Sequence, residues 1–320
     1  MAELEVFSIP VLHQFRGLTI RQGMIIQGEA GIAEWSPFPQ YDVPEASSWL
    51  RAAREVATQG YPPPQRTSVM VNSTIPSVDP ATAYHLTREA GCRTAKVKVA
   101  EPTQSLYDDI ARVEAVRDAL GPTGLLRIDA NGGWTLDEAT LALRSLRPYD
   151  LEYVEQPCTS LEDLAALRKL VDVRVAADES IRRSSDPWAV RQAEAADLIV
   201  LKVQPLGGIE PCLRLAEQWD MNVVVSSALE TSVGLRAGLA LAGALPELRY
   251  ACGLNTIGLL GGDVTTDSLR AYGGEIVIAE VSLDPCRLEQ VRADTSTVQL
   301  WTRRLSQCQD YCARERSHHG

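Results

Sequence analysis

Three acidic residues stand at matching places in the chain, each at the end of a short apolar run. Asp129 follows LLRI, Glu155 follows LEYV, and Asp178 follows VRVAA. Taken singly, an acidic residue at a strand end is most often a helix cap or a solvated loop residue. If the runs are neighbouring barrel strands, their carboxylates meet at one mouth and raise one another's pKa unless a cation lies among them. Oxygen ligands without Cys or His favour a hard divalent ion, so we predict one Mg²⁺, for which Mn²⁺ can substitute.

Three lysines flank these carboxylates. Lys96 and Lys98, in TAKVKVA, are two residues apart and point to the same face of one strand, whereas Lys202 ends the apolar run LIVLK. The alternative for KVK is an exposed edge strand, which a closed barrel does not have. A lysine that faces another lysine and a divalent cation has a lowered pKa and can act as a base. A lysine base with Mg²⁺ predicts abstraction of a proton α to a carboxylate.

The elements that must hold these side chains recur along the chain. Strand-like runs occupy 68–75, 94–100, 125–130, 151–157, 173–179, 197–203, 222–227 and 249–254, with helix-like segments between them. One polar residue near each strand end gives Asn72, Lys98, Asp129, Glu155, Asp178, Lys202, Ser226 and Asn255, spaced on average about 26 residues apart. One strand, one helix and two loops need about that length, so an α/β fold of (β/α)₈ type, a TIM-like barrel, is predicted. The competing open doubly wound sheet lacks support, because no GxGxxG or Walker loop is present.

The ends of the chain have a different pattern. Residues 1–62 contain four short strand-like runs, LEVFSIP, FRGLTIR, GMIIQGEA and GIAEWSP, with GEAG as a hairpin signal. The helix-like PEASSWLRAAREVATQG follows, and YPPPQ then breaks the chain. We therefore expect an α+β capping domain at 1–62 and the barrel at 63–265. The segment 266–320 loses the period, and either returns to the capping domain or forms a mobile tail.

Composition limits the class of protein. Of 320 residues 45% are apolar and the net charge is −11, which argues against a nucleic-acid or anionic-membrane surface. The seven cysteines include no zinc pattern, and no export signal or membrane-spanning run is seen. We expect a reduced, cytoplasmic protein whose partner is a small-molecule carboxylate, and the pattern assigns no oligomeric state.

Several motifs resemble those of a known enzyme family. TAKVKVA, RIDANGGW, YVEQPC, AADES and LKVQPLGG resemble the enolase superfamily, and the arrangement of three lysines resembles its muconate-lactonizing subgroup. More narrowly, FRGLTIRQG, SSALETSVGL and YACGLNT are similar to the o-succinylbenzoate synthases of menaquinone biosynthesis. The resemblance covers about residue 5 to about residue 265.

The resemblance implies a role for each matching position. Asp129, Glu155 and Asp178 would be the metal ligands, Lys98 the base that later protonates the departing hydroxide, and Lys202 the stabiliser of the ene-diolate. The implied substrate-binding residues are Lys96, Asn131, Ser226, Ser227 and Arg16. For Asn131 an Asx-turn, and for the two serines a helix cap, are equally good readings.

Three functions are considered, of which the first two follow from this resemblance. The first is an Mg²⁺-dependent lyase that dehydrates 2-succinyl-6-hydroxy-2,4-cyclohexadiene-1-carboxylate to o-succinylbenzoate. The second is an N-succinyl amino acid racemase on the same site, and the third, weakest, is a non-catalytic barrel. Dipeptide epimerases carry Asp-x-Asp at the eighth strand end, where this chain reads CGLNT (252–256) without an acid, so a clamp for a substrate ammonium group is not expected.

Overall fold

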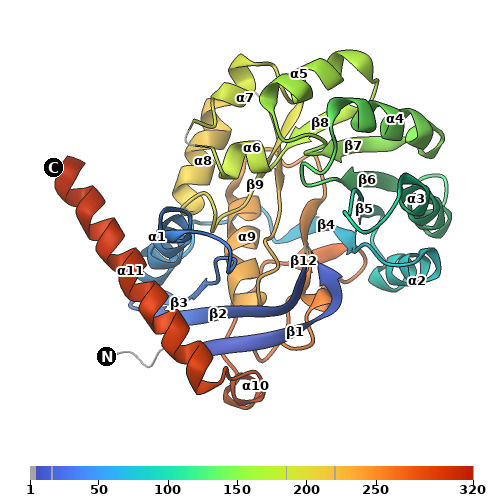
Figure 1. Cartoon of the computed structure of the whole chain (residues 1–320). Helices are drawn as coiled ribbons and strands as arrows, with labels where there is room; N and C mark the ends of the chain where they lie inside the picture. Colours follow the sequence, from blue (N-terminus) through green and yellow to red (C-terminus); the bar gives the residue numbers. More distant parts are fainter. Residues whose placement is uncertain (1–4, 16, 185, 220, 320) are drawn as a thin grey trace.

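The structure, a computed structural model, consists of two sheets with helices packed around them (Figure 1). It describes residues 5–15, 17–184, 186–219 and 221–319. The first sheet is antiparallel, in the order β1-β2-β3, and its strands are β1 (Glu5–Phe15), β2 (Leu18–Gly28) and β3 (Gly31–Trp35). The second sheet contains every strand-like run predicted between residues 68 and 254. The N-terminal residues therefore form a sheet separate from that of the predicted barrel strands.

The second sheet is a nearly closed parallel barrel. Its eight parallel strands are β4 (Ser68–Ile75), β5 (Thr94–Lys98), β6 (Leu125–Asp129), β7 (Leu151–Glu155), β8 (Arg174–Ala177), β9 (Leu198–Leu201), β10 (Asn222–Val225) and β11 (Cys252–Asn255). They are paired in the order β10-β9-β8-β7-β6-β5-β4-β11. At the seam, Ser226 forms a parallel bridge with Gly253, and the Ser227 backbone N–H donates to the Gly253 carbonyl at 3.0 Å. The predicted (β/α)₈-type barrel with an N-terminal capping domain is therefore confirmed.

Helices connect successive barrel strands and cover the outside of the barrel. They are α2 (Pro80–Ala90), α3 (Leu106–Leu120), α4 (Leu136–Leu146), η1 (Arg147–Tyr149), α5 (Leu161–Leu170), α6 (Glu179–Arg182), α7 (Ala189–Gln192), α8 (Ile209–Gln218) and α9 (Ser232–Ala244), and η2 (Ile257–Leu259) follows β11. Capping boxes at Ser105 and Thr135 begin α3 and α4, because each hydroxyl accepts from the third helical N–H. Between β8 and β9 the structure has two short helices of four residues each, α6 and α7. Within the described residues, no helix is both long and apolar enough to cross a membrane.

The capping domain differs from the predicted pattern in one respect. FRGLTIR and GMIIQGEA are not separate strands, because residues 18–28 form the single strand β2, which pairs with β1. The hairpin predicted at GEAG is present, with Gly28 opposite Gly31. The helix after it is α1 (Val43–Gln59), whose first turn is capped by Asp42. Arg16 lies outside the described residues.

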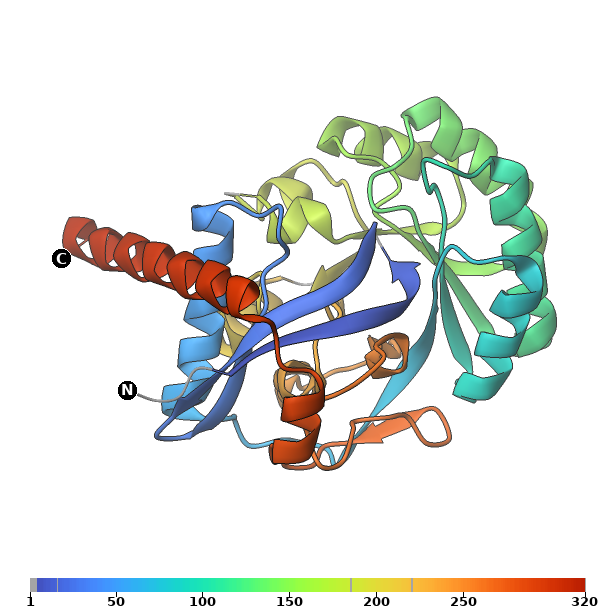
Figure 2. The ribbon, with the colours of Figure 1, turned by 60° about the horizontal axis from the view of Figure 1, so that its bottom comes forward.

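The C-terminal segment returns to both parts of the molecule. β12 (Glu275–Val277) pairs antiparallel with β4, and α10 (Pro285–Gln290) and α11 (Thr295–His319) follow. The Ala293 N–H donates to the Val6 carbonyl at 3.0 Å, and Trp301 packs edge-on against Trp35 at 5.2 Å between ring centroids. Figure 2 shows α11 lying beside the N-terminal sheet and α1. The 266–320 segment thus contacts the capping domain and continues as a helix through His319.

Buried charges join the capping domain to the barrel. Glu34 of β3 accepts hydrogen bonds from the backbone N–H groups of Thr231 at 3.0 Å and Gly234 at 3.2 Å, at the start of α9. Arg21 of β2 donates from Nε to the Leu229 carbonyl at 2.8 Å. Burial raises the pKa of Glu34 to about 7, although Arg21 opposes the rise. The interface therefore contains a carboxyl group that titrates near neutral pH.

The titration of Glu34 predicts a pH-dependent stability. A carboxyl group whose folded pKa lies above its unfolded pKa costs stability as pH rises from the unfolded value, about 4.3, through the folded value. With a folded pKa of about 7, the cost is complete above that pH and amounts to about 4 kcal/mol. Glu34→Gln should therefore reduce the fall in unfolding free energy between pH 5 and pH 8, measured by urea denaturation. The exposed Glu247→Gln is the control, and identical pH profiles for wild type and Glu34→Gln would contradict the prediction.

Candidate active site

The carboxyl ends of the barrel strands carry the residues predicted to do chemistry. Lys98, Asp129 and Glu155 are the last residues of β5, β6 and β7, and they pair in register. Asp178 and Lys202 directly follow β8 and β9. None of the five is more than 8% exposed. Because β5 and β9 lie four strands apart in an eight-stranded barrel, Lys98 and Lys202 approach the mouth from opposite sides.

Both lysines of the KVK motif point into the barrel. Lys98 Nζ donates to Asp129 Oδ2 at 2.5 Å and to Asn131 Oδ1 at 2.7 Å. Lys96 Nζ donates to Glu155 Oε2 at 2.7 Å and to Asp129 Oδ2 at 3.2 Å. The aromatic ring of Phe15, from the capping domain, lies 4.9 Å from Lys98 Nζ. The edge-strand reading of this motif is therefore wrong, and Lys98 lies where the capping domain meets the barrel.

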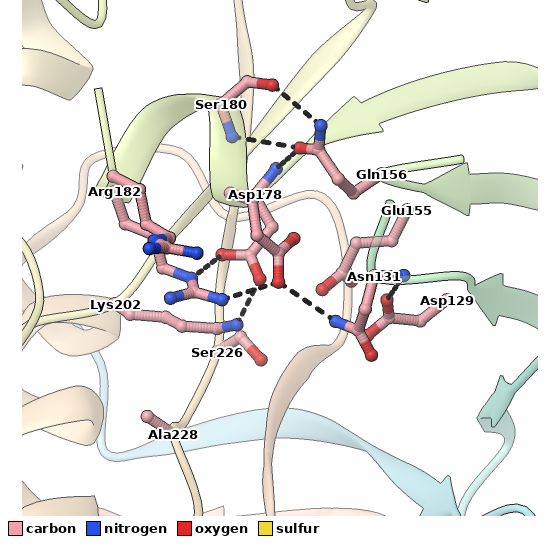
Figure 3. Close-up of polar contacts among 12 residues, drawn as sticks. Asp129, Asn131, Glu155, Gln156, Asp178, Ser180, Arg182, Lys202, Ser226 and Ala228 are labelled. Atoms are coloured by element: carbon pink, nitrogen blue, oxygen red, sulfur yellow. Dashed lines mark hydrogen bonds and ion pairs between the residues drawn. The ribbon is translucent and has the colours of Figure 1, made fainter. Parts of the chain in front are cut away.

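On the other side of the mouth, Lys202 is held by Asp178. Lys202 Nζ donates to Asp178 Oδ2 at 2.5 Å, while Arg182 Nε donates to Asp178 Oδ1 at 3.0 Å. Gln156 Oε1 accepts the Asp178 backbone N–H at 2.9 Å and so fixes the start of α6. Figure 3 shows the side chains of Glu155, Asp178 and Lys202 directed toward the same space. Lys98 and Lys202 therefore contact different carboxylates, Asp129 and Asp178, on opposite sides of the mouth.

The charges of these groups are strongly coupled. Burial alone would raise the pKa of Asp129, but Lys98 and Lys96 outweigh burial and hold that pKa well below its usual range. Burial and the charge of Asp129 raise the pKa of Glu155 to about 7. Burial would lower the pKa of Lys96, but Glu155 and Asp129 raise it above the usual range, so Lys96 remains an ammonium. Glu155 is therefore the carboxylate whose charge is least compensated.

The acid on the opposite side is ionised. Burial would raise the pKa of Asp178, but the charges of Arg182 and Lys202 and the hydrogen bond from Lys202 lower it. The same ion pair, with Glu179 as a second acid, raises the pKa of Arg182 despite its burial. Arg182 was not predicted from the sequence, although its position four residues after Asp178 on a helix is the signal that could have found it.

The carboxylates of Asp129, Glu155 and Asp178 offer the oxygen atoms that a hard divalent cation prefers as ligands. Glu155 Oε1 is buried and has no hydrogen-bond partner in the described part of the chain, which suits an oxygen that would bind a cation. The ligand geometry is not formed, however. Among the described residues, no group of three or more His, Cys, Asp or Glu side chains is placed to hold a metal ion. Lysine ammonium groups bind the carboxylate oxygens instead, so the three-ligand assignment stays a prediction.

A small cavity of about 20 Å³ lies at this mouth. Its lining residues are Phe15, Phe38, Thr74, Lys96, Lys98, Asp129, Lys202, Ser226, Ser227, Ala228, Leu229, Gly253 and Thr256. Both lysines on opposite sides of the barrel reach it, together with two aromatic rings from the capping domain. Phe15 and Phe38 were not predicted, because no local pattern marks a capping-domain ring that reaches a barrel mouth.

The structure places most of the predicted substrate-binding residues in or beside this cavity. Lys96, Ser226 and Ser227 line it. Ser227 Oγ is 2.8 Å from Thr256 Oγ1, and neither serine is the N-cap of α9, which is Thr231. The helix-cap reading of the serines is therefore wrong.

Asn131 lies beside this cavity and contacts Lys98. Its side-chain oxygen accepts from Lys98 Nζ, and its Nδ2 donates to Glu179 at 3.2 Å. The Asx-type turn here belongs to Asp129, whose Oδ1 accepts the Asn131 backbone N–H at 3.0 Å. Asn131 therefore links Lys98 to α6 and does not itself close the turn.

Comparison with known proteins identifies the family. Models described as "Enolase C-terminal domain-like" and "Enolase N-terminal domain-like" match residues 80–281 and 6–57. An o-succinylbenzoate synthase from Thermobifida fusca is 53% identical over 94% of this chain and 94% of its own. The chain belongs to the o-succinylbenzoate synthase family of the enolase superfamily. A second relative, the o-succinylbenzoate synthase of Mycolicibacterium smegmatis, is 46% identical over 96% of this chain and 95% of its own.

Solved structures share the fold of this o-succinylbenzoate synthase family member. The N-succinyl Arg/Lys racemase of Bacillus cereus has a TM-score of 0.77 at 19% identity, covering 91% of this chain and 97% of its own. The muconate lactonizing enzyme of Pseudomonas fluorescens has a TM-score of 0.78 at 19% identity, covering 91% and 98%. Enzymes of the o-succinylbenzoate synthase family generally use a divalent metal ion.

Proposed function

We propose that this protein dehydrates 2-succinyl-6-hydroxy-2,4-cyclohexadiene-1-carboxylate to o-succinylbenzoate, a reaction of menaquinone biosynthesis that takes place in the cytoplasm. The observation that carries the proposal is the pair of buried lysines, Lys98 and Lys202, on opposite sides of one cavity. A flat ring bound between them would present one face to each lysine. The 53% identity to the o-succinylbenzoate synthase of Thermobifida fusca supports this choice of substrate.

The residues of this chain have distinct tasks in the reaction. Lys98, once neutral, accepts the proton α to the substrate carboxylate, and the electron pair of the C–H bond moves into that carboxylate. Lys202, on the other face, remains an ammonium and stabilises the negative charge that develops there. Lys98 then returns its proton to the departing hydroxide, so one water leaves and the ring becomes aromatic. Protons and electrons balance without a further reactant.

We propose Mg²⁺ as the divalent ion, with Mn²⁺ able to replace it, and Asp129, Glu155 and Asp178 as its ligands. A cation at this position would neutralise charge on the substrate carboxylate. Its binding requires that the lysine ammonium groups release the carboxylate oxygens that they now contact. Glu155 supports the proposal, because its buried Oε1 has no hydrogen-bond partner among the described residues and a cation would supply one.

Removal of divalent ions should abolish turnover and lower the melting temperature. Three buried carboxylates lose the ligand that balances their charge, and a ligand present at about 100 times its dissociation constant contributes about 2.7 kcal/mol to stability. The measurement is turnover and thermal melting after chelation with EDTA, then after adding back Mg²⁺, Mn²⁺ or Ca²⁺. Undiminished turnover after chelation would contradict the ligand assignment.

The function itself is tested with purified protein and Mg²⁺. Conversion of the cyclohexadiene substrate to o-succinylbenzoate is followed by NMR, beside racemisation of an N-succinyl amino acid by circular dichroism. Dehydration without racemisation supports the lyase alone. If neither substrate turns over while Mg²⁺ raises the melting temperature, the substrate assignment is wrong and the metal assignment survives.

Racemase activity is a second candidate function, because of the way in which Lys98 and Lys202 are placed. Lys98 and Lys202 are equally well seated, each with its Nζ 2.5 Å from a carboxylate oxygen. Two bases on opposite faces of an α-carbon are what a two-base racemisation requires, because one removes a proton and the other supplies one. An N-succinyl amino acid bound between the two lysines would therefore have a base on each face of its α-carbon.

A further inference from the structure

The loop 226–231, between β10 and α9, supplies one wall of the cavity. Ser226, Ser227, Ala228 and Leu229 of this loop all line it. Leu229 has a φ of +64°, a left-handed conformation that a leucine rarely adopts. A backbone in such a conformation persists only where its surroundings hold it there. The contacts that hold this loop therefore decide the shape of the cavity wall.

The capping domain provides those contacts through Arg21. This arginine of β2 is 1% exposed and lies 208 residues before Leu229 in the chain. Its Nε donates to the Leu229 carbonyl at 2.8 Å, and its Nη2 lies 3.4 Å from the Ala228 carbonyl. Nη2 also donates to Ser36 Oγ at 2.8 Å. One guanidinium thus ties two carbonyls of the barrel loop to the capping domain.

Two buried carboxylates hold the amide groups of the same loop. Glu230 accepts the Ala228 N–H at 2.6 Å. Glu34, on β3 next to β2, accepts the Thr231 N–H at 3.0 Å and receives a hydrogen bond from Ser36 Oγ at 2.5 Å. Arg21 therefore donates to carbonyl oxygens of the loop, while Glu34 and Glu230 accept hydrogen bonds from its N–H groups. This division of contacts leaves the loop little freedom once the domains are docked.

The same cluster extends to the Phe38 ring and to the segment that follows β9. The Phe38 ring, which lines the cavity, lies 4.8 Å from Arg21 Cζ. Gln204, two residues after Lys202, accepts the Ser36 N–H at 3.2 Å. Arg21 itself is not among the residues that line the cavity. Its influence on a bound molecule is therefore exerted through its neighbours.

We propose that Arg21 is a positioning residue for substrate recognition: from the capping domain, it fixes residues 226–229, which form one wall of the cavity between Lys98 and Lys202. The proposal rests on the proposed function for the identity of the substrate. If the proposal holds, the shape of the 226–229 wall, which is part of the barrel, depends on the capping domain. Loss of the guanidinium should therefore weaken binding more than the proton-transfer step, since Lys98 and Lys202 keep their own carboxylate partners.

The test compares Arg21→Lys with a matched control, Arg117→Lys. Arg117 also donates to several backbone carbonyls, those of Tyr149, Gly121, Gly124 and Asp150, but lies in α3 away from the cavity. Arg21→Lys should raise KM for the cyclohexadiene substrate by about 10- to 100-fold, the equivalent of one or two lost hydrogen bonds to a charged group, with kcat changed far less. Arg117→Lys should leave KM unchanged.

Hydrogen exchange supplies a readout that needs no turnover. The amide groups of residues 226–231 should exchange faster in Arg21→Lys than in wild type, and those in Arg117→Lys should not. If wild type fails to dehydrate the substrate, the proposed function fails while the exchange comparison still tests the role of Arg21. Unchanged exchange and an unchanged KM in Arg21→Lys would overturn the proposal, as would equal changes in both variants.

A second variant keeps the test open if Arg21→Lys does not fold. Arg21→Met combined with Glu34→Gln removes a buried cation together with one of the two buried carboxylates near it, which leaves a smaller charge imbalance than removal of Arg21 alone. It should show the same rise in KM and the same faster exchange, with Glu34→Gln alone as its reference. A double variant with the KM of its reference would overturn the proposal.

Discussion

Lys98→Ala is expected to lower kcat for dehydration by at least about 10²–10⁴-fold, the usual effect of removing a general base. The loss should exceed that range, because the same side chain also returns the proton to the departing hydroxide. The fold should persist, since Asp129 keeps Lys96 Nζ at 3.2 Å. The measurement is kcat for o-succinylbenzoate formation, beside circular dichroism and thermal melting.

Lys98→Arg is the matched control for charge. Arginine keeps a cation beside Asp129 but does not lose its proton near neutral pH, so it cannot serve as the base. Both variants should therefore be inactive, and Lys98→Arg should melt closer to wild type. If Lys98→Ala retained near-normal turnover, the base would have to be Lys202 or a metal-bound water. If Lys98→Arg alone were active, the side chain would act by charge and not by proton transfer.

The barrel could be predicted because its units repeat. Each strand is a short apolar run that ends in a polar residue, and the interval of about 26 residues matches one strand, one helix and two loops. Strand pairing in a barrel follows chain order, so the repeat also places Lys98, Asp129 and Glu155 side by side. Six of the eight polar positions lie at the mouth; Asn72, within β4, instead accepts from Arg127 at 3.2 Å, and Asn255 contacts Cys92 at 3.6 Å.

The remaining parts of the site depend on contacts between distant segments. Arg21 and Leu229 are 208 residues apart, and nothing near either residue in the sequence signals the other. The same applies to Phe15 and Phe38, which reach the barrel mouth only because the capping domain docks there. Docking of this kind is decided by the packing of whole surfaces, which no local period records. The sequence does not determine the course of 266–320 for the same reason.

Lys202 offers the second large effect, because it separates the two candidate functions. In a one-base elimination, Lys98 handles both proton steps and Lys202 contributes charge alone. In a two-base racemisation, Lys202 must itself give or take a proton. Lys202→Ala removes both capacities, so both activities should fall, with the loss of an electrostatic stabiliser equivalent to about 3–4 kcal/mol in the barrier to dehydration. By itself this variant does not distinguish the two roles.

Lys202→Arg distinguishes them, because arginine keeps the charge next to Asp178 but stays protonated near neutral pH and so cannot act as an acid or base. Racemisation of an N-succinyl amino acid should vanish in this variant, whereas dehydration should survive in part. The surviving rate depends on how well a planar guanidinium fits beside Asp178 and Arg182, which already form an ion pair at 3.0 Å. Both activities are measured on one preparation, with Mg²⁺-dependent melting to show that the metal still binds. Equal loss of both activities under those conditions would mean that Lys202 transfers a proton in each reaction, and the division of roles between the two lysines would be wrong.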